Sequence, residues 1–375
     1  MPVDVRPVSS KAELKRFIRL PWRIYRNEPL WVPPLVFERR RFLDRGKNPF
    51  FGHGEAEYFV AWRDGEAVGR ITAQIDHDFN RFHGNRWGMF GFFESEDDPE
   101  VAAALLGAAE AWLRERDRDR MVGPMDFTMN DESGIVIEGF DLPPMVKQPY
   151  HPRYYQGLVE GAGLTKAQDM FMWNLEVTDR DRVLPVIWEM AEQLEPKHGI
   201  TLRKLDKRRI EDEFDTFLEI YNVAWSTNWA FVPISREEIA HTAREMKPIL
   251  DEDWLMACDT PDGETVGIAL TIPDINQVLK RMNGRVLPLG WLKFLWYKPR
   301  VNRVRVGFLG VLPEYQHTGI AAAMYAEHFR MAAVKPQHGG EMGWILESNE
   351  AMNRGMEAMG GRIVKRYRVY ERVFA

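Results

Sequence analysis

Apolar and polar positions follow one another in short blocks along this chain, and the blocks predict helices and strands in turn. In the second half, apolar residues at helical spacing predict helices at 209–223 and 236–247, the second ending before Pro248. Alternation around a turn predicts a hairpin at 254–272. The later predicted elements are a strand at 301–311, a helix at 320–334, a strand at 342–347, a helix at 350–359 and a strand at 362–374. This order predicts an α/β fold (an α+β mixed sheet) with both antiparallel and parallel pairing.

The chain also contains an internal repeat. Segments 58–69 and 254–267 each hold an apolar run, an Asp-Gly turn and a second apolar run, which is the pattern of a β-hairpin. Segments 155–163 and 353–361 each look like a helix that stops at glycine before a final strand. The offset is the same in both pairs (263 − 65 = 198 and 355 − 157 = 198). Chance similarity is not expected to keep register in this way.

A third pair of segments shows where the two copies differ. Segment 88–93 resembles 307–312 at a larger offset (307 − 88 = 219), so an insertion must precede Gly307 and be balanced later. The second copy has the extra stretch 271–300, and the first copy has the extra loop 127–151. Each copy therefore carries an insertion of its own.

Two copies of one domain explain this arrangement. The predicted domains are 1–178 and 183–375, each a twisted mixed sheet flanked by helices, with a linker near 177–182, where apolar patterning gives way to Asp and Arg. The length of 375 residues agrees, because single cores rarely grow beyond about 250–300 residues. Two unrelated α/β domains that share common turn residues are the alternative.

Composition limits the kinds of ligand and compartment. With 45% hydrophobic and 28% charged residues the chain is expected to fold. Its net charge of −6 gives no general attraction to nucleic acids or anionic membranes, so any anionic ligand must be held locally. No signal-peptide pattern and no apolar run of about 18 residues is present, which predicts a cytoplasmic location. One cysteine, Cys258, excludes an internal disulfide, and no metal-ligand spacing is evident.

The segment 305–325 gives the strongest indication of chemistry. An apolar strand runs into Pro313, a short loop follows, and an alanine-rich helix begins. Such a loop leaves backbone N–H groups at a helix N-terminus, where they and the helix dipole hold a phosphate. Gly319 allows close approach, and Ala321 keeps the next contact small. Phosphate binding at this loop is therefore predicted, with an ordinary helix start as the alternative.

At these residues the chain resembles the GNAT superfamily of acyl-CoA transferases, whose pyrophosphate loop has the pattern Gln/Arg-x-x-Gly-x-Gly/Ala after a bulged strand. The order of elements over 183–375 agrees with that superfamily. The resemblance implies that the loop holds the pyrophosphate of an acyl-coenzyme A, the preceding strand pairs with pantetheine, and an N–H near Val311 faces the thioester oxygen. The coenzyme-binding residues implied in this way are Leu309, Gly310, Val311, Gln316, His317, Thr318, Gly319, Ile320, Ala321 and Asn349.

The first copy departs from this pattern. Its corresponding segment, 94–100, has no glycine and five carboxylates. Acidic residues stabilise a helix start but repel a pyrophosphate. The first copy is therefore expected to have lost coenzyme binding and to help enclose an acceptor pocket between the copies.

The sequence also offers candidate residues for proton transfer and for acceptor binding. The last helix, 350–359, lacks the Tyr that many GNAT members use as a general acid. Glu347 follows a strand beside the implied thioester and is the candidate base, with a solvated or ion-paired Glu as the alternative. The candidate acceptor residues, for which core packing is the alternative, are Tyr221, Trp225 and Asn228.

One further apolar stretch of the second copy has an expected packing partner. The stretch 287–297 is too short to span a membrane. Packing against the first domain is expected for it, and a membrane surface or a long acyl chain is the alternative partner.

The predicted activity is acyl-CoA-dependent transfer to an amine of a small molecule or peptide, by direct attack on the thioester. A non-catalytic acyl-CoA-binding protein is the alternative, and a P-loop is disfavoured because no Lys-Ser/Thr follows Gly319.

Overall fold

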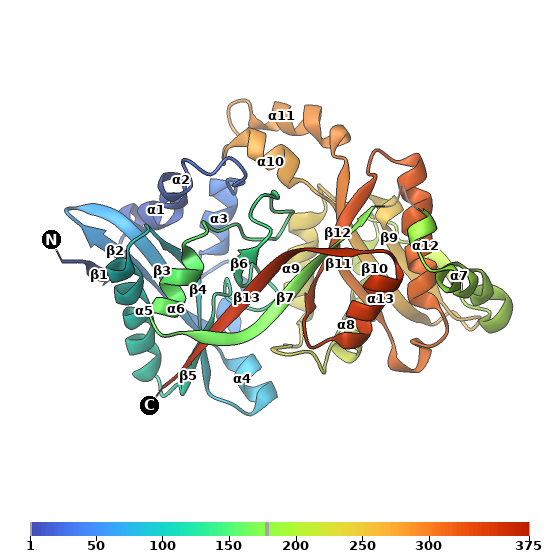
Figure 1. Ribbon diagram of the computed structural model, residues 1–375, viewed down its shortest axis with the longest axis horizontal. Helices are drawn as coiled ribbons and strands as arrows, with labels where there is room; N and C mark the ends of the chain where they lie inside the picture. Colours follow the sequence, from blue (N-terminus) through green and yellow to red (C-terminus); the bar gives the residue numbers. More distant parts are fainter. Residues whose placement is uncertain (1, 177–179, 375) are drawn as a thin grey trace. The chain divides into compact units, whose positions relative to one another are not determined.

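The structure is a computed structural model in which residues 2–176 and 180–374 are described (Figure 1). The chain forms two compact units. Their bounds differ from those of the two sequence copies, because each unit includes segments of the other copy. Unit 1 comprises residues up to 170, then 276–295 and 365 onward; unit 2 comprises 171–275 and 296–364. Part of the predicted linker, 177–179, lies outside the described residues.

Unit 1 is built around a mixed sheet. The strand order is β1-β2-β3-β4-β5-β13, and β6 pairs with β13. Neighbouring strands are antiparallel except for β4 and β5, which are parallel. The strands are β1 (Asp4–Pro7), β2 (Gly54–Arg63), β3 (Glu66–Asp76), β4 (Trp87–Ser95), β5 (Arg120–Gly123), β6 (Ile135–Glu138) and β13 (Arg362–Val373), and β7 (Thr165–Glu176) begins here. The helices are α1 (Lys11–Arg19), α2 (Pro21–Ile24), α3 (Val36–Phe42), α4 (His77–His83), α5 (Pro99–Arg114), α6 (Tyr155–Gly161) and α10 (Asn276–Met282), with the 3₁₀ turn η1 (Pro49–Gly52).

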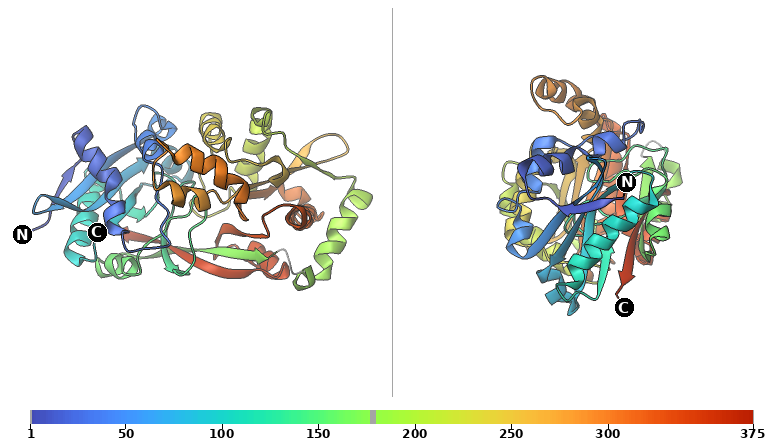
Figure 2. Two further views of the ribbon diagram at one scale, coloured as in Figure 1. Left: turned by 90° about the horizontal axis from the view of Figure 1, so that it is seen from above. Right: turned by 90° about the vertical axis from the view of Figure 1, so that its left-hand side faces the viewer.

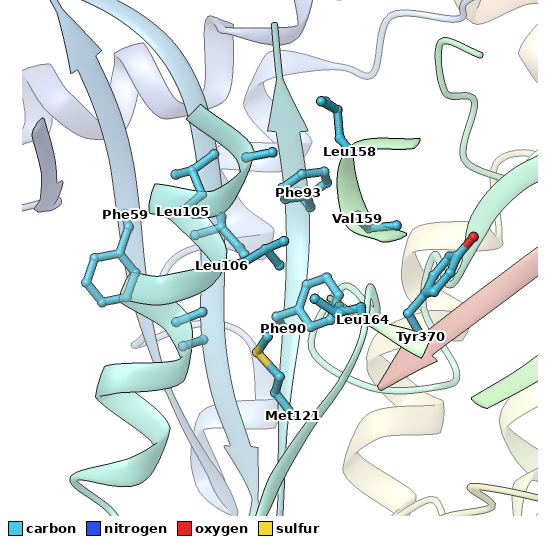
Figure 3. Close-up of a cluster of buried hydrophobic side chains, with 14 of the residues drawn as sticks. Phe59, Phe90, Phe93, Leu105, Leu106, Met121, Leu158, Val159, Leu164 and Tyr370 are labelled. Carbon is cyan, nitrogen blue, oxygen red and sulfur yellow. The ribbon is translucent and has the colours of Figure 1, made fainter. Parts of the chain in front are cut away.

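The core of unit 1 lies between α5 and the sheet. Leu105 and Leu106 of α5 belong to one buried cluster with Phe59 of β2 and with Phe90 and Phe93 of β4 (Figure 3). Together with Val101 and Ala102, one turn earlier, they form the side of α5 that covers apolar residues of the strands. The last strand of the chain closes this core, since the buried Tyr370 of β13 belongs to the same cluster and stands opposite Gly123 of β5.

Unit 2 repeats the plan. Its strands follow the order β12-β11-β10-β9-β8, antiparallel except for the parallel pair β11 and β12. They are β8 (Thr201–Lys204), β9 (Leu255–Asp259), β10 (Thr265–Pro273), β11 (Arg303–Val311) and β12 (Gly339–Leu346). The helices are α7 (Pro185–His198), α8 (Phe214–Ala224), α9 (Arg236–Met246), α12 (Ile320–Val334) and α13 (Glu350–Ala358), and α11 (Gly290–Tyr297) begins in unit 1. The 3₁₀ turns are η2 (Arg180–Arg182), η3 (Ile210–Glu213), η4 (Glu252–Trp254), η5 (Lys298–Arg300) and η6 (Pro313–Tyr315).

The same pairing scheme in both copies confirms the predicted fold class, mixed sheets flanked by helices. In each copy a hairpin (β2–β3, β9–β10) pairs with a longer strand (β4, β11), and that strand runs parallel to the strand after the next helix (β5, β12). The predicted helix 320–334 coincides with α12, whereas β12 begins before the predicted 342. The missed start, 339–341, opens with Gly339 and Gly340, which have no side chains to indicate a strand. A Cβ at Gly340 would lie 2.3 Å from the carbonyl oxygen of Val304.

The insertion of the second copy packs on N-terminal elements of unit 1. The Trp22 indole N–H donates to Oδ1 of Asn283 at 3.0 Å, and the Val36 N–H donates to the Gly284 carbonyl at 3.1 Å. Both views in Figure 2 draw α10 and α11 in orange near these blue elements. The expected packing of 287–297 is wrong for most of its apolar side chains, which are exposed. The preceding residues, 276–284, make the contacts instead.

Two further features concern the described part of the chain. No helix in it is long and apolar enough to cross a membrane. Among the same residues, no group of three or more His, Cys, Asp and Glu side chains is placed to hold a metal ion.

Candidate functional site

The candidate site begins where β11 and β12 cease to pair. The two strands pair from Arg303 opposite Gly339 to Val306 opposite Met342. Beyond this point β11 continues to Val311 with β10 as its partner among the described strands. We call residues 307–311 the free edge of β11. A free edge presents backbone donors and acceptors to a ligand that pairs as a strand would.

The corresponding place in unit 1 is filled by the chain itself. Strands β4 and β5 pair only from Trp87 to Met89, although β4 continues to Ser95. Met125 then donates its N–H to the Phe90 carbonyl at 2.8 Å, and Oδ1 of Asp126 accepts from the Phe92 N–H at 2.8 Å. A Cβ at Gly91 would lie 2.0 Å from the Met125 carbonyl oxygen. The edge that is free in unit 2 is therefore occupied in unit 1.

A short loop leads from the free edge into α12. The Thr318 hydroxyl donates to the Tyr315 carbonyl at 2.6 Å, and the Gln316 amide reaches the Val311 carbonyl at 3.4 Å. Gly319 is the N-cap residue, with φ of 96°, and no side chain caps the helix. The first N–H groups of α12 thus lack an acceptor from a capping side chain, while Gln316 and His317 are exposed beside them. This is the geometry that binds phosphate at helix N-termini.

Gly319 has a second reason to be glycine. A Cβ at this position would lie 2.9 Å from the carbonyl oxygen of Met190, which belongs to α7. The left-handed φ and the close approach of α7 both exclude a side chain. Substitution of Gly319 would therefore disturb the packing of α7 as well as any ligand at the loop.

The helix that corresponds to α12 in unit 1 is capped by its own chain. Asp98 accepts from the Glu100 N–H at 2.9 Å at the start of α5. Arg63 forms ion pairs with both Asp98 and Glu100. Glu94 of the same acidic segment is buried, and its carboxylate accepts from the Tyr25 and Tyr155 hydroxyls at 2.7 Å. Burial raises the pKa of Glu94, against the lowering effect of Arg70. The acidic segment is therefore largely engaged within the fold, and a carboxylate already occupies the helix start.

Val311 and Glu347 lie at the C-terminal ends of neighbouring strands. Val311 is the last residue of β11, five residues beyond the last β11–β12 pair, Val306 opposite Met342. Glu347 is half-buried and directly follows the end of β12. Asn349 caps α13, because its side-chain oxygen accepts from the Met352 N–H at 3.1 Å. A ligand at Asn349 would therefore meet a side chain that already has a structural role.

The candidate acceptor residues lie on α8 and in the turn after it. The Tyr221 and Trp225 rings pack on Phe308 of β11, with centroid distances of 5.9 and 5.0 Å. Tyr221 is buried, and its hydroxyl donates to the Val232 carbonyl at 3.4 Å. Trp225 is half-buried and donates its indole N–H to the Leu309 carbonyl at 3.4 Å. The half-buried Asn228 lies in the following turn. Trp225 thus contacts the free edge directly, whereas Tyr221 supports it from the core.

The sequence did not indicate that α12 contains a buried histidine. His328 of α12 contacts Oγ1 of Thr271 at 2.7 Å through Nε2, and its Nδ1 contacts the Met324 carbonyl at 2.6 Å. A carbonyl can only accept, so Nδ1 carries the proton and Nε2 accepts from the threonine hydroxyl. Burial lowers the pKa of His328 to about 4, against the raising effect of the Met324 hydrogen bond. The pairing of His328 with Thr271 is set by tertiary packing, so no local pattern predicts it.

We expect His328 to make the protein less stable in mild acid. The folded-state pKa of about 4 lies below the ordinary 6.5, so the unfolded chain binds the proton first as the pH falls. The free energy of unfolding should therefore decrease between pH 6.5 and 4, by on the order of 2–3 kcal/mol from this residue. Urea unfolding at several pH values should show a weaker dependence for His328→Gln than for the wild type. An equal pH dependence of the unfolding free energy in the two proteins would contradict this role of His328. Burial also lowers the pKa of His151 to about 4, so a smaller pH dependence should remain in both proteins.

Comparisons with known proteins place the chain in a family. No family model matches it. It is 38% identical to the Bacterial ceramide synthase of Caulobacter vibrioides, over 99% of this chain and 97% of that protein. It is 36% identical to Protein YghO of Escherichia coli strain K12, over 98% of this chain and 95% of that protein.

Solved structures with the same fold are more distant in sequence. A tandem GNAT protein from the clavulanic acid biosynthesis pathway matches with a TM-score of 0.59 and 13% identity, over 99% of this chain and 98% of that one. A GCN5-related N-acetyltransferase from Sphaerobacter thermophilus matches with a TM-score of 0.53 and 14% identity, over 99% and 95%. The chain therefore has the fold of a tandem GNAT protein, and it belongs to the family that contains the Caulobacter and Escherichia coli proteins.

Proposed function

We propose that this protein is an acyl-CoA-dependent N-acyltransferase whose single coenzyme site lies in unit 2. The observation that carries the proposal is the uncapped N-terminus of α12 directly after the free edge of β11. The helix N-terminus is suited to a pyrophosphate, and the free edge is suited to the strand-like pantetheine arm. We propose no second site in unit 1, because the corresponding strand edge and helix start there are both occupied by the chain itself.

We assign a role to each part of this site. The loop from Gln316 to Ala321 holds the pyrophosphate, and Leu309, Gly310 and Val311 align the pantetheine. An N–H near Val311 stabilises the oxyanion that forms when the amine attacks the thioester carbonyl. The new C–N bond replaces the C–S bond, coenzyme A leaves as its thiol or thiolate, and the amine proton passes to Glu347 or to a water that it orients.

The acceptor is inferred from the relative named a ceramide synthase. A ceramide is the amide of a fatty acid and a long-chain amino alcohol, so its synthesis by acyl transfer is the N-acylation that the GNAT fold suits. We infer that a long-chain amino alcohol is the acceptor here and that the acyl group is a fatty acyl chain. The aromatic surface of Trp225 beside the free edge suits an apolar acceptor, with the half-buried Asn228 as a polar contact.

We expect the purified protein to release coenzyme A thiol only when an acyl-CoA and a long-chain amino alcohol are both present. Acetyl-CoA and palmitoyl-CoA should be compared, each with sphinganine and with ethanolamine, and the amide identified by mass spectrometry. The palmitoyl-CoA and sphinganine pair should be fastest, since long chains add apolar contact. Protein thiol adds little background, because burial raises the pKa of Cys258, the single cysteine, to about 12.

Two outcomes would separate the alternatives. Amide formation with ethanolamine but not with sphinganine would overturn the acceptor class and keep the N-acyltransferase. Tight acyl-CoA binding with no amide from either amine would favour a non-catalytic acyl-CoA-binding protein.

A further inference from the structure

One short segment carries a large share of the exposed apolar side chains. Of the fourteen large hydrophobic residues that are exposed in the described chain, six lie between residues 287 and 296, with exposed fractions of 45–73%. These six are Leu287, Leu289, Trp291, Leu292, Leu295 and Trp296. Apolar side chains gathered in this way mark a surface that binds something, whereas single exposed ones need no explanation.

The segment is held rigidly at its base, so its exposure is not fraying. Val278 and Met282 of α10 are buried, and the Asn276 amide donates to the Pro144 carbonyl at 3.0 Å. A Cβ at Gly284 would lie 2.4 Å from the Trp22 ring, so the turn after α10 fits only a glycine. Lys293 of α11 donates to the Arg281 carbonyl at 2.7 Å. These contacts fix α11 while its apolar side chains remain in solvent.

The exposed side chains of α11 form one stripe. At about 100° per residue, Trp291, Leu292, Leu295 and Trp296 fall within an arc of about 140°. Phe294 and Tyr297 lie outside this arc, and both are less exposed than the stripe. Helix α11 therefore turns its most apolar side outward, the reverse of an ordinary surface helix.

The charged residues within the segment that carries the stripe have one sign. Residues 276–300 contain no Asp or Glu, although the whole chain has a net charge of −6. The same range contains six basic residues: Lys280, Arg281, Arg285, Lys293, Lys298 and Arg300. No ion pair among the described residues joins Lys280, Arg285, Lys293 or Arg300 to a carboxylate. This local positive charge is opposite to that of the chain as a whole.

We propose that the segment 287–297, the docking helix, binds the surface of a bilayer that contains anionic phospholipids. Trp and Leu side chains at the acyl boundary with Lys and Arg at the phosphates are the composition of an interfacial helix. The eight residues of α11 span about 12 Å, much less than the roughly 30 Å hydrocarbon core, so the helix lies in the interface and does not cross it. A segment with six basic residues and no acidic ones matches the many phosphates of a bilayer better than the mixed charges of most protein surfaces.

This inference does not rest on the proposed acyl transfer. The two agree, however, because a long-chain amino alcohol partitions into bilayers, and a docked enzyme would meet it there. The binding can be measured without any turnover, so failure of one proposal leaves the other untouched.

We expect the full-length protein to sediment with vesicles made of equal parts phosphatidylcholine and phosphatidylglycerol, and much less with phosphatidylcholine alone. The double variant Leu292→Glu/Leu295→Glu should lower the vesicle partition coefficient by at least about tenfold, because it places two anions in the stripe. Both positions are exposed, so the variant should fold. Lys280→Gln/Arg285→Gln should weaken binding to the anionic vesicles by about fivefold per charge and leave the weak binding to phosphatidylcholine unchanged.

A matched control is available at another exposed apolar position. Val334 is 74% exposed at the C-terminal end of α12, and Val334→Glu should bind vesicles like the wild type. The proposal is overturned if the wild type sediments with neither vesicle, in which case the stripe is assigned to a protein partner. It is also overturned if the Leu292→Glu/Leu295→Glu variant, shown to be folded by its circular dichroism and melting temperature, binds as the wild type does.

Discussion

The double variant Gln316→Glu/His317→Asp is expected to bind acyl-CoA about 10²-fold more weakly than the wild type. Each substitution places a carboxylate beside the α12 N-terminus, where we propose that the pyrophosphate lies. At a partly exposed site a charge pair a few ångströms apart is worth about 1–2 kcal/mol after screening, so two such pairs give about 10²-fold. Both residues are exposed in the loop. The one printed side-chain contact that the changes remove is the long hydrogen bond from the Gln316 amide to the Val311 carbonyl, at 3.4 Å.

The expected effect on folding stability has the opposite sign. A loss of acyl-CoA binding caused by the added charges can therefore be distinguished from a loss caused by misfolding. Acidic side chains near a helix N-terminus stabilise the helix. The variant should therefore unfold at the same temperature as the wild type or slightly higher. Gly319 is a poorer position for this test, because a side chain there would approach the Met190 carbonyl as well as the ligand.

Isothermal calorimetry with coenzyme A and an acyl-CoA measures the effect. His338→Asp is the matched control: the same substitution at an exposed position beyond the C-terminal end of α12. The 15 residues of α12 separate the two sites by about 22 Å, beyond the screening length at physiological salt. The control should bind within about twofold of the wild type, with one coenzyme per chain. Unchanged affinity in the folded double variant, or two coenzymes per wild-type chain, would refute the site.

The sequence predicted those parts of the fold that depend on local signals. The hairpin 254–272 was marked by its Asp-Gly turn, and it is formed by β9 and β10. The helix 320–334 was marked by Gly319 before it and by its alanine content, and its bounds agree with α12. In both places the conformational preference of a few residues agrees with the tertiary structure.

The exchange of segments between the units depends on long-range contacts and was not predictable in the same way. The residues of β13 indicate a strand, but nothing in their pattern specifies β5 as the partner, with Tyr370 opposite Gly123. The α10 segment likewise has helical spacing, yet its packing beside Trp22 follows from a fit that only the folded chain provides. Secondary structure is set within a few residues, whereas the choice of partner is set by packing.

The same distinction applies to the candidate site. The loop Gln316–Ala321 was identifiable because its glycine, preceding proline and following helix are adjacent in sequence. The filling of the unit 1 edge by Met125 and Asp126 was not, because it depends on how the loop after β5 folds back. The acidic segment before α5 is unlike a pyrophosphate loop in its sequence, and its lack of coenzyme binding stays a prediction. Its hydrogen bonds to Tyr25 and Tyr155 come from distant elements and explain how so many carboxylates are accommodated.

Glu347→Gln is expected to lower the turnover number by about 10²-fold while leaving the affinity for acyl-CoA nearly unchanged. An amine must reach the thioester in its neutral form, and the proton that it loses needs an acceptor. Glu347 is the candidate for this role, because it directly follows β12, and the neighbouring strand β11 ends at Val311, where the oxyanion N–H is proposed. Glutamine keeps the shape of the side chain and removes its ability to accept a proton, and loss of a general base costs about 10²–10⁴-fold in rate.

The matched control is Glu350→Gln, the same substitution three residues later, at an exposed position in the first turn of α13. It should leave turnover within about twofold of the wild type. Since a base acts on the chemical step, Glu347→Gln should lower kcat and kcat/KM for the amine together. Its rate should also recover in part at higher pH, where more of the amine is already neutral and the base is needed less. Turnover within a few-fold of the wild type, with no change in the pH–rate profile, would show that Glu347 is structural and that the amine loses its proton to solvent.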